Sequence, residues 1–176
     1  MRSVGQSKFS VASLGAMPIP ATYDTFTISR HLPANPQAVF GLFADEGSWR
    51  RWFRMPGSGA AYEHDFRVGH GDHASSDFTH DDGRVERLEN RAVYLAIDTA
   101  ERIVFAYHAI VDGIPRWASL VTVELRPEGD GTELTWTEKV ALLVPSGDGS
   151  HDLPHLRGAV RLRLNGLAAA LTGNPG

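Results

Sequence analysis

Residues 64–82 hold the densest group of chemically active side chains in the sequence. Four of the eight histidines and five aspartates fall within these nineteen residues. Imidazole nitrogens and carboxylate oxygens are common ligands of zinc and iron, so the composition is typical of a metal centre. Such a centre also requires three or four of these groups to converge on one point. The nine side chains are His64, His70, His73, His80, Asp65, Asp72, Asp77, Asp81 and Asp82.

The alternation of apolar and polar residues divides this cluster between two faces. If Phe66 and Val68 point toward the core, strict alternation places His64 on the same inward face. In the following strand, an inward Phe78 carries His80 inward as well. The other histidines and aspartates of the two strands then face solvent.

We expect the two strands to be joined by a tight turn around Gly71. This turn contains His70 and Asp72, and the resulting pairing sets His64 opposite Phe78. Only two histidines of the cluster then share a face, which is too few for a metal centre. The sequence therefore predicts a polar hairpin with no bound metal and no other cofactor.

Glu138 is the second candidate for chemistry. In "TELTWTEKVALL", alternation from Leu134 and Trp136 points Glu138 toward the interior, where an unpaired carboxylate would be costly. One interpretation makes it a general acid or base, or a polar anchor for a ligand. The other gives it an arginine or backbone partner and a purely structural role. Both remain open at this point.

Aromatic residues cluster around the same predicted volume, and four of them are tryptophans. We expect Trp49, Tyr107 and Trp117 to line a pocket, whereas Trp52 and Trp136 can be explained as core. The candidates for proton transfer are Glu138 and His64. The full predicted ligand-binding set is Trp49, His64, Phe78, His80, Tyr107, Trp117 and Glu138.

Length and composition limit the classes of protein. At 176 residues and 42% hydrophobic, the chain suits one domain with a sizeable core. The net charge of −4, with interleaved signs, argues against nucleic acid as a partner. The absence of cysteine removes disulfides and thiolate sites and fits a reducing compartment, so we expect a cytoplasmic protein. No apolar run approaches the roughly 20 residues that span a bilayer.

The elements that position these residues follow from periodicity. A strand is predicted at 23–32, two short helices between 35 and 53, and six strands joined by turns from about 60 to 140. From Asp152, apolar residues recur at helical spacing over about 18 residues. Such a meander must bury its apolar face against the long helix, which predicts an α+β helix-grip fold with an internal cavity.

The ends of the chain lack this patterning. We expect a flexible tail at residues 1–22, one helix-grip domain at 23–172 and a short tail at 173–176. Because patterned sequence begins just after Met17, this residue is a candidate for the natural start of translation.

Four segments carry a family resemblance. In order, "NPQAVFGLFADEGSWRRWF", "HDFRVGHGD", "ERIVFAYH" and "SLVTVELRPEGDGTELTWTEKVAL" resemble the SRPBCC superfamily of helix-grip, or START-like, domains. The most similar branch is named after the C-terminal domain of the activator of the heat-shock-protein-90 ATPase. The resemblance covers residues 24–172. It implies a curved sheet around a long helix, with a cavity that binds hydrophobic ligands in many members and cyclises polyketides in some.

Three hypotheses about function follow. The first is a protein that binds a small hydrophobic or aromatic molecule in the cavity. The alternative is an enzyme of the polyketide cyclase or dehydratase type that uses Glu138 or His64 as acid or base. The third is an interaction or stress-related module without a ligand, for which a homodimer is one arrangement. No complete catalytic constellation can be read, which favours binding over catalysis.

Overall fold

The computed structural model describes residues 20–172. The predictions of a tail at 173–176, of a start at Met17 and of most of the tail at 1–22 lie outside the described residues. The first strand begins at Thr22. The strands are β1 (Thr22–Leu32), β2 (Ser58–His64), β3 (Asp72–Thr79), β4 (Val85–Asp98), β5 (Arg102–Val111), β6 (Ile114–Glu128) and β7 (Gly131–Leu142). The helices are α1 (Pro36–Ala44), α2 (Glu46–Trp52) and α3 (Asp152–Leu171).

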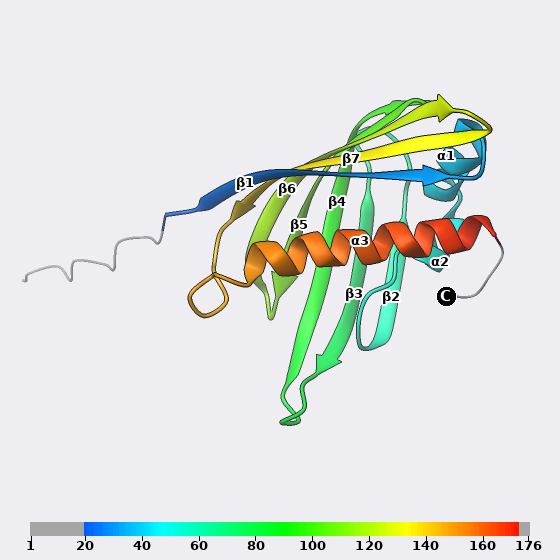
Figure 1. The fold of residues 1–176 in the computed structure, drawn as a ribbon. Coiled ribbons are helices and arrows are strands. Elements are labelled where there is room, and N and C mark those ends of the chain that lie inside the picture. Colours follow the sequence, from blue (N-terminus) through cyan, green and yellow to red (C-terminus); the bar gives the residue numbers. More distant parts are fainter. Residues whose placement is uncertain (1–19, 173–176) are drawn as a thin grey trace, which may run out of the picture.

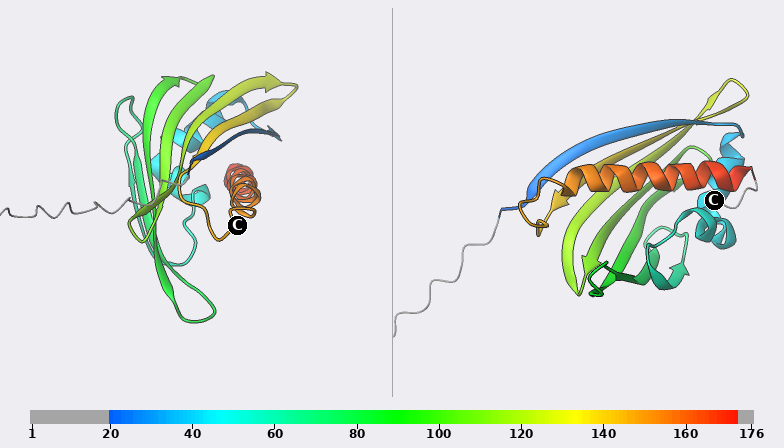
Figure 2. Two further views of the ribbon diagram at one scale, coloured as in Figure 1. Left: turned by 90° about the vertical axis from the view of Figure 1, so that its left-hand side faces the viewer. Right: turned by 60° about the horizontal axis from the view of Figure 1, so that its bottom comes forward.

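All seven strands form one antiparallel sheet in the order β1-β7-β6-β5-β4-β3-β2. Strands β2 to β7 follow one another as a meander, and β1 adds to β7 at one edge. The sheet curves around α3, which crosses its concave side, and α1 and α2 lie at one end of that space (Figures 1 and 2). This confirms the predicted α+β helix-grip fold.

The two short helices are specified by their caps. Asn35 accepts a hydrogen bond from the Ala38 amide at 2.9 Å, and Pro36 occupies the first helical position, where a missing N–H has no consequence. Asp45 ends α1 and caps α2, because its carboxylate accepts from the Ser48 amide at 2.7 Å. This direct junction places Trp49 of α2 against β2 and Trp52 against α1.

Helix α3 presents one apolar stripe to the rest of the domain. Leu156, Val160, Leu164 and Leu167 are buried, and they recur at the three- and four-residue spacing of one helix face. Gly166 allows α3 to approach α2 closely, since a Cβ there would lie 3.2 Å from the Trp52 carbonyl oxygen. The helix therefore packs tightly against α2, which forms one wall of the space below the sheet.

Candidate functional site

A fully buried carboxylate, Glu138, stands at the centre of the concave face and is 0% exposed. Tyr107 and Ser119 hydroxyls each donate to its Oε1 at 2.6 Å, and Trp136 Nε1 donates to its Oε2 at 3.0 Å. Trp117 Nε1 extends the network by donating to the Tyr107 hydroxyl at 3.3 Å. The regular alternation of β5, β6 and β7 therefore gathers three predicted site residues, Tyr107, Trp117 and Glu138.

Three neutral donors supply the partner that Glu138 needs, rather than the arginine or backbone group of the structural interpretation. Burial raises the pKa of the Tyr107 hydroxyl, the charge of Glu138 raises it further, and the charge of Arg163 opposes them. Tyr107 therefore stays protonated at neutral pH and acts as a donor to the carboxylate.

A second buried polar centre joins His64 to Asp72. His64 Nδ1 lies 2.7 Å from Asp72 Oδ1, and the Tyr94 hydroxyl donates to Asp72 Oδ2 at 2.6 Å. The His64 and Asp72 side chains are only 2% and 9% exposed. The imidazole also stacks on Trp49, with ring centroids 4.7 Å apart and planes 15° apart. This places two further predicted residues, Trp49 and His64, side by side.

The surroundings of His64 favour its protonated form. Burial alone would lower its pKa, but the hydrogen bond and charge of Asp72 outweigh burial, and the pKa is raised above its usual value. The Ala44 carbonyl contributes in the same direction. Nε2 is buried and makes no well-formed hydrogen bond with any side chain or backbone group of residues 20–172.

The connection between β2 and β3 differs from the predicted tight turn. It occupies residues 65–71, and Asp72, predicted in the turn, is the first residue of β3 and lies directly opposite His64. The predicted pairing of His64 with Phe78 is therefore wrong. Val68, predicted to face the core, lies in this connection and is 57% exposed.

Close contact with β4 explains the different register. A Cβ at Gly71 would lie 1.8 Å from the Ala92 carbonyl oxygen, so only glycine allows the chain to pass there. The same connection exchanges backbone hydrogen bonds with Tyr94 through Gly69 and His70, at 2.9 and 2.8 Å. Strand β4 thus anchors the segment and brings the Tyr94 hydroxyl to Asp72.

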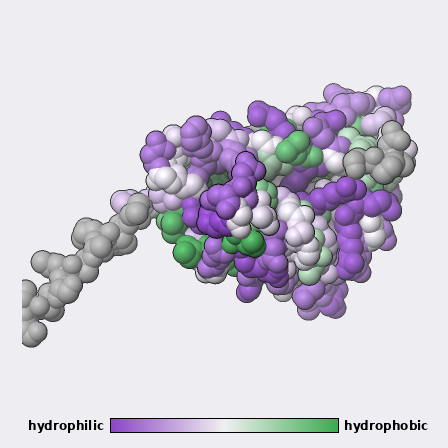
Figure 3. Space-filling view, turned by 90° about the horizontal axis from the view of Figure 1, so that it is seen from below, coloured by the Kyte–Doolittle hydropathy of each residue, from purple (hydrophilic) through white to green (hydrophobic). Residues whose placement is uncertain are grey.

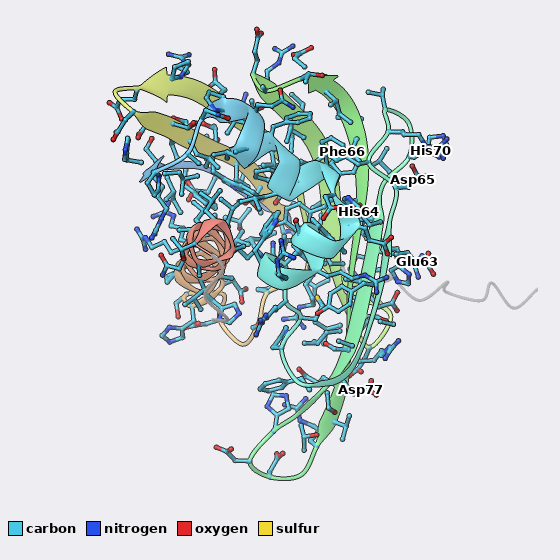
Figure 4. The ribbon with its side chains drawn as sticks, turned by 90° about the vertical axis from the view of Figure 1, so that its right-hand side faces the viewer. Glu63, His64, Asp65, Phe66, His70 and Asp77 are labelled. Atoms are coloured by element: carbon cyan, nitrogen blue, oxygen red, sulfur yellow. The ribbon has the colours of Figure 1, made fainter. Side chains whose placement is uncertain are left out.

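His70 and His73 of the 64–82 cluster are paired with carboxylates away from the two buried centres. Figure 4 shows His64 beside the short helices, while Asp65 and His70 lie on the outer side of the sheet. His70 lies 3.2 Å from Asp65, and His73 lies 3.2 Å from Glu89. Within residues 20–172, the only three such ligand groups close enough to share an ion lie elsewhere, on the β1, β6 and β7 strands: His31, Glu128 and Glu133.

Phe78 and His80 lie at the far end of the β3–β4 hairpin. His80 follows the last residue of β3, and its imidazole lies 3.0 Å from the Glu86 carboxylate. The Phe78 and His80 rings touch each other at 5.0 Å between centroids. Neither residue lines the internal void or the groove described next, so the structure separates them from His64 and Glu138.

A narrow internal void of about 20 Å³ lies between the two polar centres, which is room for about one water molecule. Asp72 and Tyr94 of one centre and Tyr107 and Trp136 of the other contribute to its wall. Asn90, Ala92, five aromatic side chains and one arginine complete the lining. The aromatic residues and the arginine are Phe43, Trp49, Trp52, Phe53, Phe105 and Arg163.

A much larger open groove of about 1260 Å³ runs between α2, the segment after it and α3. Its apolar lining includes Trp52, Met55 and Leu162, and small residues of α3 form much of its floor. Trp52 and Arg163 line both the groove and the void, so these two side chains separate one space from the other. The predicted cavity is thus a small closed space beside a large open one.

Sequence reasoning missed four residues of the site: Asp72, Tyr94, Ser119 and Arg163. The sequence pattern places Asp72 in a turn, and Tyr94, which pairs with Phe105 of β5 on one side, meets the 65–71 connection on the other, a contact that no alternation pattern indicates. Arg163 lies off the apolar stripe of α3, which suggests solvent, yet its guanidinium sits over the Phe53 ring at 4.6 Å. The sequence feature that could have indicated Arg163 is an arginine beside small residues on one face of the predicted helix.

The convex face of the sheet carries a shallow apolar hollow of about 620 Å³. Val93 and Leu120 are exposed there, next to the smaller Ala106, Ala118 and Ala141.

No helix within residues 20–172 is long and apolar enough to cross a membrane.

The curved sheet, the helix across its concave face and the enclosed polar centres define a helix-grip domain of the α+β class. The chain belongs to the family described as activator of Hsp90 ATPase homolog 1-like protein, whose model matches residues 33–171. This is the SRPBCC branch that the sequence resemblance indicates, and domains of this fold typically bind ligands.

Several solved bacterial structures are similar to the chain. The Mll3558 protein of Rhizobium loti is 39% identical with a TM-score of 0.69, over 86% of this chain and 99% of its own. A protein from Rhizobium leguminosarum is 28% identical with a TM-score of 0.71, over 88% and 97%. CalU16 of Micromonospora echinospora, 18% identical with a TM-score of 0.56 over 84% and 75%, shares the fold. No curated protein matches the chain.

Proposed function

We propose that the protein binds a small hydrophobic or aromatic molecule in the groove between α2 and α3, beside the void under the concave face of the sheet. One observation carries this proposal: a large, mostly apolar groove lies beside a buried void with polar groups, and Trp52 and Arg163 line both. A bound molecule would lie in the groove and extend toward the void when these side chains turn aside. Pockets of this kind, mostly apolar with a few polar groups, are typical of small-molecule sites.

The polar centres suit recognition better than catalysis. Glu138 already accepts three hydrogen bonds, and His64 is not among the residues that line the void. An enzyme of the cyclase or dehydratase type would need one of them to reach a substrate. The acid or base role of Glu138 or His64 therefore remains the alternative hypothesis.

Blocking the groove tests the proposal. Gly158 lines the groove, and a Cβ there meets no atom within 4 Å, so Gly158→Leu fills the space without a clash at that position. Gly41 of α1 has equally open surroundings and lies outside the groove, which makes Gly41→Leu the matched control. A panel of hydrophobic and aromatic compounds is screened by the shift in melting temperature that linkage produces.

We expect compounds that raise the melting temperature of the unmodified protein and of Gly41→Leu, but not of Gly158→Leu. Quenching of tryptophan fluorescence should accompany binding, because Trp52 lines the groove. A panel without any binder, or binders that are indifferent to Gly158→Leu, would contradict the proposal.

A further inference from the structure

The groove between α2 and α3 is positively charged although the chain as a whole is negative. Four arginines and one histidine line it, and no acidic residue among those described does so. The net charge of the whole chain is −4, so the acidic residues are concentrated elsewhere. The basic residues of the groove are Arg51, Arg54, Arg161, Arg163 and His155. On the face seen in Figure 3, hydrophilic residues predominate and hydrophobic ones form small separate patches.

Arg163 is the most informative of these residues. Its guanidinium makes no hydrogen bond or ion pair with residues 20–172, and its described contact is the face of the Phe53 ring at 4.6 Å. Arg157, on the same helix, is by contrast paired with Asp24 and lies over Phe26. A half-buried guanidinium without a carboxylate, at the boundary between groove and void, is available for an anion.

Arg51 extends the same positive surface. Its guanidinium donates to the Ser48 hydroxyl at 2.8 Å, which leaves most of its N–H donors available. No carboxylate of residues 20–172 lies within ion-pair distance of Arg51 or Arg161. Guanidinium groups bind carboxylates through paired hydrogen bonds, and such contacts are stronger at partly buried positions.

We propose that this groove binds an amphiphilic carboxylate, with its anionic head at Arg163 and Arg51 and its apolar body along Trp52 and α3. This inference rests on the proposed function and adds the chemical class of the ligand. The small residues of α3, among them Gly158, Ala159 and Gly166, leave room for a chain or a flat ring beside the helix.

The buried carboxylates fix the orientation of such a ligand. Asp72 lines the void, and Glu138 lies behind Tyr107 and Trp136 of its wall. An anionic head inside the void would be repelled by these carboxylates, so the head is expected on the groove side of Arg163, whose side chain lines both spaces. The apolar body then lies along the groove, beside Trp52 and α3.

Three probes with one chain length and different heads test this: dodecanoate, dodecanol and dodecylammonium, each below its micelle concentration. Binding to the full chain is followed by tryptophan fluorescence and calorimetry. We expect dodecanoate to bind at least about tenfold more tightly than dodecanol, and dodecylammonium to bind most weakly. The difference in affinity between dodecanoate and dodecanol should decrease as salt is added, because ions screen partly exposed charges.

Variants of α3 locate the head. Arg163→Gln should weaken dodecanoate binding by about tenfold and leave dodecanol within about twofold, since only the charged contact is lost. Arg163→Lys keeps the charge, so its affinity for dodecanoate should lie between those of the unmodified protein and Arg163→Gln. Arg157→Gln removes the same charge from the same helix outside the groove, so it should leave both affinities unchanged.

The outcomes separate this inference from the proposed function. Equal binding of dodecanoate and dodecanol, lost together in Gly158→Leu, would overturn the anion preference and leave the proposed function intact. Binding of neither probe, with no binder in the broader panel, would overturn both. Binding to phosphatidylserine vesicles without binding to monomeric dodecanoate would replace the small carboxylate by a membrane surface, and so would also overturn this inference.

Discussion

Two buried carboxylates, Glu138 and Asp72, are each held by a tyrosine hydroxyl at 2.6 Å, yet they form different kinds of centre. Glu138 is surrounded by neutral donors from three adjacent strands. Asp72 has a histidine as its second partner, and that histidine is contributed by a different strand, β2. The first centre joins a carboxylate to hydroxyl and indole donors, whereas the second contains a histidine, the side chain whose ordinary pKa lies closest to neutral pH.

The comparison shows how strand regularity determines what a buried acid can do. In the middle of the sheet, β5, β6 and β7 offer hydroxyl and indole donors at fixed positions, so both oxygens of Glu138 accept hydrogen bonds. At the edge, where β2 joins β3 through residues 65–71, a histidine can reach the acid. We infer that Glu138 and its donors contribute mainly to the stability of the fold. The pair of His64 and Asp72 makes that stability sensitive to pH.

The largest effect is expected when the central acid is removed. Glu138→Ala should lower the free energy of unfolding by about 3–5 kcal/mol, because three buried donors lose their acceptor and a cavity remains. Glu138→Gln keeps one acceptor oxygen and should cost about 1–3 kcal/mol. Equilibrium unfolding in urea measures both values.

Glu133→Ala is the matched control on the same strand, since Glu133 is only partly buried. We expect a change of about 0.5 kcal/mol or less for it. A similar loss of stability for Glu133→Ala and Glu138→Ala would contradict the view that the donor network stabilises the centre of the sheet.

The two tyrosines give a direct test of the difference. Tyr107→Phe and Tyr94→Phe each remove one hydrogen bond to a carboxylate, at an expected cost of about 1–3 kcal/mol. Tyr107→Phe should be the more destabilising, because it also leaves the Trp117 indole N–H without its acceptor. Double-mutant cycles with Glu138→Gln and Asp72→Asn measure each coupling separately. A loss of stability in Tyr94→Phe that equals or exceeds the loss in Tyr107→Phe would contradict the prediction that the Glu138 centre stabilises the fold more.

The sequence predicts the centre of the sheet well and its edge poorly. Glu138 points inward because alternation from Leu134 holds along an unbroken strand. The predicted pairing of His64 fails because register depends on the length of the connection, which periodicity does not contain. The contact of Gly71 with the Ala92 backbone decides that length, and it is visible only in three dimensions.

Partners from distant strands limit prediction in the same way. The Tyr94 hydroxyl meets Asp72 across 22 residues of sequence, and no local pattern links them. Arg163 looks like a solvent residue on a helical wheel, and only the packing of α3 against α2 turns it toward Phe53. Residue type and alternation thus indicate which side chains are buried, and tertiary packing determines which of them meet.

The pH dependence of the free energy of unfolding also distinguishes the two centres, with a smaller expected effect. Since the pKa of His64 is raised in the folded state above its ordinary value of 6.5, its pairing with Asp72 stabilises the fold fully below about that pH. This contribution is lost as pH rises through the folded-state pKa. The stability difference between the unmodified protein and His64→Gln should therefore be largest near pH 5.5 and shrink toward pH 9.

Tyr107→Phe is the control for that experiment. Because the pKa of Tyr107 is raised above its usual value, the hydroxyl stays protonated and its loss should cost the same at every pH in this range. A His64→Gln deficit that is constant or grows with pH would show that His64 is buried in its neutral form.

The smallest effect is expected at the β3–β4 turn, where His80 lies outside both centres. Its ring is partly exposed and contacts Phe78 and Glu86, and Glu86 keeps Arg84 as a second partner. His80→Ala should therefore change the free energy of unfolding by about 0.5 kcal/mol or less and leave ligand affinity unchanged. His64→Ala, measured in the same assay, should cost clearly more because it leaves Asp72 with a single partner. A loss of ligand binding in His80→Ala would mean that the hairpin folds back over the groove, and it would return His80 to the site from which the register of β3 separates it.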